Sequence, residues 1–115
     1  MKKTKILVHG THPEILQTVL RLINKNEAWE GEGSTDEETV IEYFQKEKYD
    51  LVMLGGGIST SSEKKLRAVF NRLNPQVKII QHYGGGSGLL KSEIETALAA
   101  KRNNRFSVVD NPFET

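Results

Sequence analysis

Short apolar runs alternate along this chain with longer stretches in which apolar residues recur every three or four positions. The short runs indicate strands buried on both faces, and the longer repeats indicate helices with one apolar side. A weaker run at 29–34 is interrupted by glycine, which predicts a strand at the sheet edge. The five predicted strands span residues 5–8, 29–34, 51–54, 77–80 and 106–109.

The helical repeats fall between these strands. Pro13 suits the first position of the first helix, and Thr35 and Glu38 have the spacing of a capping box that would begin the second. Ser61 or Ser62 is expected to cap the third helix. The four predicted helices span about 13–24, the residues that follow Thr35, the residues from the serine cap to Leu73, and about 89–101.

Strands that alternate with helices through short connections predict a parallel sheet with right-handed crossovers. The fold class is therefore α/β. The chain has 115 residues, which suits a single domain over residues 1–115.

Composition narrows the possible functions. The 16 basic and 15 acidic residues give a net charge of +1, so there is no electrostatic case for a nucleic-acid partner. The chain has no cysteine, which excludes disulfides, thiolate metal sites and cysteine nucleophiles. The apolar run 6–8 near the start is too short for a signal peptide or a membrane span, so we expect a soluble, cytoplasmic protein without a membrane partner.

Several segments together resemble the receiver domain of response regulators, and they cover nearly the whole chain in the family's order and spacing. They are residues 5–8 with 12–16, residues 49–54, residues 77–80, and Asn111-Pro112-Phe113. The resemblance implies the CheY-like, flavodoxin-like three-layer fold, whose five parallel strands have the order 2-1-3-4-5. It also implies a place in two-component signalling.

The chemistry of that family is phosphorylation of an aspartate. An acidic pair holds Mg²⁺, the aspartate accepts the phosphoryl group, and a Ser or Thr and a Lys respond to it. At the matching positions this chain has Gly10 and Thr11, then Gly55, Tyr83 and Asn111. None of these can do the family's chemistry, because Mg²⁺ requires carboxylate oxygens and Gly55 has no side chain. The resemblance is therefore to a degenerate pseudo-receiver with no catalytic residues.

A second alignment places Lys91 at the family's lysine and removes the fourth helix. It leaves only residues 84–88 to connect two parallel strands, which need a dozen or more residues. We therefore favour the first alignment, in which the family's last helix is missing. One face of the third to fifth strands would then be bare, and we expect a protein partner or a second copy, as in a homodimer, to cover it.

Three loops are expected to meet at the carboxyl edge of the sheet, where open α/β sheets bind ligands. Their backbone N–H groups could hold a phosphate, a nucleotide or another anion. No loop has a P-loop lysine or a complete G-x-G-x-x-G, so plain turns are the simpler interpretation. The candidate residues are His9, Gly10, Thr11, Gly55, Gly56, Gly57, Gly84, Gly85 and Gly86.

Other chemistry has little support. His9, His12 and His82 could approach one another at that edge, but without a cysteine or a well-placed carboxylate we expect no metal. Tyr83 is expected to fill the space of the lost carboxylates. We expect no cofactor and no enzymatic activity, because no acid–base pair or activated nucleophile is visible. Two hypotheses remain: an interaction module that signals without phosphorylation, and a small-ligand module that uses the glycine-rich loops.

Overall fold

The computed structural model describes residues 3–82 and 90–99 of the chain. The strands are β1 (Thr4–His9), β2 (Trp29–Ser34), β3 (Leu51–Gly55) and β4 (Lys78–His82). The helices are α1 (Pro13–Asn24), α2 (Glu37–Lys46), α3 (Thr60–Leu73) and an unlabelled helix over residues 90–99. None of the helices in this described part is long and apolar enough to cross a membrane.

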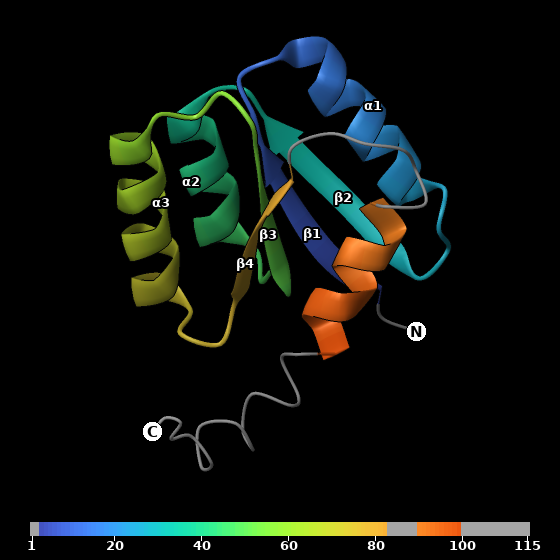
Figure 1. The fold of residues 1–115 in the computed structure, drawn as a ribbon. Coiled ribbons are helices and arrows are strands. Elements are labelled where there is room, and N and C mark those ends of the chain that lie inside the picture. Colours follow the sequence, from blue (N-terminus) through green and yellow to red (C-terminus); the bar gives the residue numbers. More distant parts are fainter. Residues whose placement is uncertain (1–2, 83–89, 100–115) are drawn as a thin grey trace, which may run out of the picture.

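The strands form one parallel sheet in the order β2-β1-β3-β4. In Figure 1, α1 and the orange helix 90–99 lie on one side of this sheet, and α2 and α3 lie on the other. The predicted α/β class and parallel sheet are confirmed. The described part of the chain holds a sheet of four strands, which match the first four of the five predicted strands. The fifth predicted strand, 106–109, lies outside the described residues.

The two central strands carry the core on both of their faces. In β1, Ile6 and Val8 pack in a cluster with α1, whereas Leu7 packs in a cluster with α2 and α3. β3 alternates in the same way, with Met53 on the α1 side and Val52 on the other. Because successive side chains of a strand point to opposite faces, the apolar runs of the sequence fill two layers at once.

The helix over residues 90–99 corrects the expectation of a bare sheet face. Leu90, Ile94 and Ala97 fall on one side of it at helical spacing and are buried in the cluster that contains Ile6 and Met53. This is the face that the favoured alignment left uncovered. The apolar stripe of the helix was visible in the sequence, but the stripe alone does not say which face of a sheet it covers. Lys91 of the second alignment lies exposed in the first turn of this helix.

Two predicted helix caps are wrong by one to three residues. Asp36, not Thr35, caps α2, because its carboxylate accepts hydrogen bonds from both the backbone N–H and the hydroxyl of Thr39. Ser59, not Ser61 or Ser62, caps α3 by accepting from the backbone N–H of Ser62. The third helix begins earlier than expected because Ile58, just before the cap, packs against the core cluster beneath α2 and α3.

Glycines in the edge strand β2 let α1 lie close to the sheet. A Cβ at Gly31 would lie 2.8 Å from the Ile23 side chain of α1. A Cβ at Gly33 would lie 2.2 Å from the backbone carbonyl oxygen of Val8, the residue that pairs with it in β1. The weak strand signal of this segment therefore has a packing reason, since only glycine fits at both positions without movement.

We expect Gly33→Ala to destabilise the domain by about 1–3 kcal/mol, because the backbone of β1 must move to admit the methyl group. Gly10→Ala is the matched control, since a Cβ there would meet nothing closer than 3.9 Å. Urea unfolding of both variants measures the difference. Equal stability of the two variants would contradict the close contact between β2 and β1.

Candidate functional site

The carboxyl ends of β1 and β3 bring two predicted positions side by side. A Cβ at Gly55 would lie 3.5 Å from the Cα of Gly10, and a Cβ at Gly10 would lie 3.9 Å from the Cα of Gly55. Thr11 follows directly, and its hydroxyl donates to the carbonyl of Gly56 at 3.5 Å. Positions far apart in the sequence thus meet at the sheet edge, as the family alignment requires. Tyr83 and Asn111, the other two positions, lie outside the described residues.

A pocket of about 270 Å³ opens on the α1 side of this edge. It brings together most of the candidate loop residues, and candidates 84–86 lie outside the described part of the chain. Its deeper walls are apolar residues that the sequence indicated only as core, namely Leu16 and Val19 of α1 with Val8 and Met53 of the sheet. The described lining residues are Val8, His9, Gly10, Thr11, His12, Ile15, Leu16, Val19, Met53, Gly55, Gly56 and Gly57.

The other side of the edge, toward α2, is polar. The His9 ring is almost fully buried, and its Nδ1 donates to the carbonyl oxygen of Ser34 at 3.0 Å. The ring is the smallest of the causes that lower the pKa of the Asp36 and Glu37 carboxyls. For Asp36 the larger cause is its bonds to Thr39, which hold the pKa below its ordinary value.

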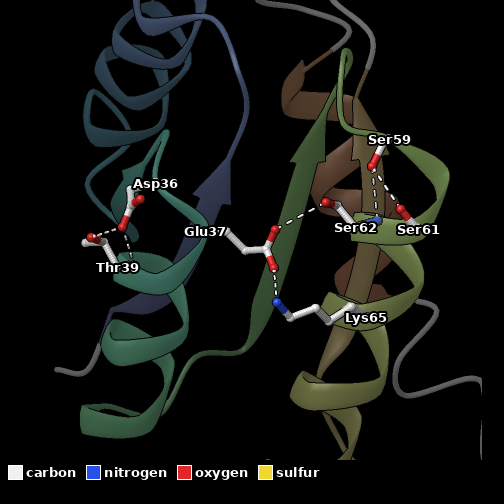
Figure 2. A network of polar contacts seen from close by, with 7 residues as sticks. All are labelled: Asp36, Glu37, Thr39, Ser59, Ser61, Ser62 and Lys65. Atoms are coloured by element: carbon white, nitrogen blue, oxygen red, sulfur yellow. Dashed lines mark hydrogen bonds and ion pairs between the residues drawn. The ribbon is translucent and has the colours of Figure 1, made fainter.

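Glu37 bridges α2 and α3 (Figure 2). Its carboxylate lies 2.7 Å from the Lys65 ammonium and accepts a hydrogen bond of 3.2 Å from the Ser62 hydroxyl. The bond with Lys65 is the main reason that the pKa of Glu37 lies below, and that of Lys65 above, its ordinary value. Sequence reasoning missed this bridge, because nothing in the local pattern says that Glu37 and Ser62, 25 positions apart on two different helices, face each other.

These contacts engage the carboxylate oxygens that a metal ion on this side of the edge would need as ligands. Asp36 and Glu37 are already bonded to Thr39, Ser62 and Lys65. Within residues 3–82 and 90–99, no three His, Cys, Asp or Glu side chains gather as a metal site would require. The His82 side chain is outside what the structure describes, so whether the three histidines approach one another is not tested.

The comparisons with known proteins find the fold but no close relative. No protein-family model and no curated protein matches the chain. The signal receiver domain of an HD domain-containing protein from Pseudomonas fluorescens Pf-5 is similar in structure, with a TM-score of 0.75 and 15% identity over 91% of this chain and 93% of that one. Other similar structures are also receiver domains.

Two further structures are similar to this chain. One chain from the structure of a histidine kinase in complex with a response regulator matches at a TM-score of 0.58 and 22% identity, over 76% of this chain and 79% of that chain. A lactose-specific IIB component domain of the phosphotransferase system from Streptococcus pneumoniae matches at 0.60 and 17% identity, over 85% and 93%. This chain therefore has the CheY-like receiver fold, and a fold by itself does not fix a function.

We expect Glu37→Gln to lower the free energy of unfolding at pH 7 by less than about 1 kcal/mol, the size of a partly exposed ion pair. The lowered pKa of Glu37 means that the folded state favours its charged form. This stabilisation is present above the ordinary value of 4.5 and is lost as the pH falls through the lower folded-state pKa.

The difference between Glu37→Gln and the unchanged protein should therefore shrink as the pH falls below about 4.5. Urea unfolding at several pH values measures it. Glu42→Gln is the matched control, because Glu42 is exposed on the same helix and no ion pair of the described residues involves it. A difference that stays constant with pH would argue against the charged bridge.

Proposed function

We propose that residues 1–115 form one receiver-like signalling domain that works without phosphorylation and without catalysis, by binding a protein partner. The observation that carries this proposal is the contact between Gly10 and Gly55 at the carboxyl edge of the sheet. At these two positions the resemblance places a metal-binding carboxylate and the phosphoacceptor. This chain has glycine at both, so neither position has a side chain that could do this chemistry.

The described carboxylates at the start of α2 are engaged in other bonds. In the chemistry of the resembled family, phosphoryl transfer needs a carboxylate nucleophile and Mg²⁺ held by oxygen ligands. The cap residue Asp36 is bonded to Thr39, and Glu37, the first residue of α2, is bonded to Lys65 and Ser62. Loss of these bonds would release the cap of α2 and the bridge to α3.

A protein partner is supported by the fold and by the surfaces it leaves free. One similar structure is a histidine kinase in complex with a response regulator, so a protein of this fold can form such a complex. The sheet face expected to mediate a homodimer is covered by α1 and the helix 90–99. A partner, or a second copy of this chain, would therefore bind helix surfaces rather than the sheet.

Addition of Mg²⁺ and beryllofluoride, a mimic of an acyl phosphate, should leave the melting temperature unchanged. A receiver that binds this mimic at about 100 times its dissociation constant would gain roughly 2.7 kcal/mol, or about 10 °C for a domain of this size. Differential scanning fluorimetry with a phosphorylatable receiver as control measures it. A rise of that size in this protein would overturn the proposal.

Gly55→Asp alone should not restore phosphorylation. The side chain has room, since its Cβ would meet nothing closer than 3.5 Å, so the variant should fold. Gly10 and Thr11 still provide no carboxylate for Mg²⁺. Incubation with radiolabelled acetyl phosphate, with circular dichroism to confirm folding, tests this. Stable labelling of the variant but not of the unchanged protein would show that the site needs only its nucleophile.

A second candidate function is the binding of a small ligand at the same edge, and the pocket beside α1 favours it. The described lining of that pocket contains no Lys or Arg, which speaks against the anion expected from the glycine-rich loops. The chemistry of the lining points to a different ligand.

A further inference from the structure

The pocket beside α1 reaches from the sheet edge into the main hydrophobic cluster. Its walls include Val8 and Met53 from the sheet and Leu16 and Val19 from α1, all of which belong to that cluster. At its mouth Ile15 is 53% exposed, one of two large apolar side chains that are exposed in the described part of the chain. Apolar surface is thus left in contact with solvent at a concave site.

The rim of the pocket is made of backbone. Gly57 has a φ of +87°, and a Cβ there would lie 2.4 Å from the Thr11 hydroxyl oxygen. Gly55, Gly56 and Gly57 therefore present peptide groups next to the opening where side chains would otherwise stand. Peptide groups and the Thr11 hydroxyl can make one or two hydrogen bonds to a ligand without supplying a charge.

The lining determines the charge of a suitable ligand. The described lining contains no Asp, Glu, Lys or Arg. The ring of His9, the buried histidine there, is bonded to the Ser34 carbonyl toward α2. A charged molecule would lose its hydration in this pocket and find only His9 and His12 as ionisable groups of the described lining, whereas an apolar molecule gains from leaving water.

The volume sets the size of the ligand. An engineered apolar cavity of about 150 Å³ holds one benzene molecule, and this pocket has about 270 Å³. Two fused rings, or one ring with a short substituent, match that space.

We propose that this pocket binds a small, uncharged ring compound that is mostly apolar and has one hydrogen-bonding group. The inference rests on the second candidate function, to which it gives a class of ligand, and neither the protein partner nor the loss of phosphorylation requires it. Such a ligand would contact α1, β1 and β3 together, at the edge where the family's phosphoryl group would otherwise act. A bound ligand would therefore link the first turn of α1 to the loop that begins at Gly55, because it would contact both.

Indole is a suitable probe because it has two fused rings and one N–H donor. Binding would be measured on the full chain by thermal shift and by methyl NMR. We expect a rise in melting temperature with increasing indole, and shifts at the methyl groups of Val8, Val19 and Met53. Inorganic phosphate and benzoate, which are charged, should bind at least tenfold more weakly than indole.

Val19→Phe should weaken indole binding at least tenfold, because the added ring occupies the pocket. Val69→Phe is the matched control, since Val69 is partly buried in the other cluster, beside α2 and α3, and it should bind indole normally. If Val19→Phe does not fold, Ile15→Arg at the exposed mouth serves instead, because a charged side chain there hinders entry without disturbing the core.

Four results would overturn the proposal. They are no indole binding up to its solubility, binding that Val19→Phe or Ile15→Arg leaves unchanged, tighter binding of phosphate or benzoate, and binding that appears only after Tyr83→Ala. The last result would mean that the chain's own tyrosine occupies the space, as the sequence suggested. The beryllofluoride result depends on carboxylates and not on this pocket, so either idea can fail without the other.

Discussion

Burial of both faces of β1 and β3 is the constraint on which the rest of the structure depends. Ile6, Leu7, Leu51, Val52 and Leu54 have no exposed surface, and they alternate between two clusters on opposite sides of the sheet. A parallel sheet with two apolar faces needs a helical layer on each. This requirement explains why α2 and α3 cover one face, and why the helix 90–99 joins α1 on the other.

The same constraint shapes the carboxyl edge of the sheet. Gly10 follows the last residue of β1 and Gly55 is the last residue of β3, so the core stops there and the two backbones come into contact. On the α2 side the space is filled by bonded polar groups that fix the first turns of two helices (Figure 2). On the α1 side the described residues leave a mostly apolar pocket.

Much of the fold could be predicted because the relevant signals are local. The apolar run 51–54, Pro13 at the start of α1 and Asn74-Pro75 at the end of α3 each act within a few residues. The caps were less predictable, since several hydroxyl and carboxylate side chains compete within one turn. At α3 the choice of Ser59 fits the packing of Ile58 against a distant cluster, which no local pattern contains.

The sequence by itself determined the α/β class, the parallel sheet, most element boundaries and the absence of side chains at Gly55 and Gly10. These features follow from residue identity and from periodicity along the chain. Only the tertiary structure decided that the helix 90–99 covers the α1 face, that Glu37 joins α2 to α3, and that Leu16 and Val19 line a pocket. The partner of an apolar stripe or of a charged residue cannot be identified from the local sequence. That partner lies in a distant part of the chain, which the burial of the sheet brings near.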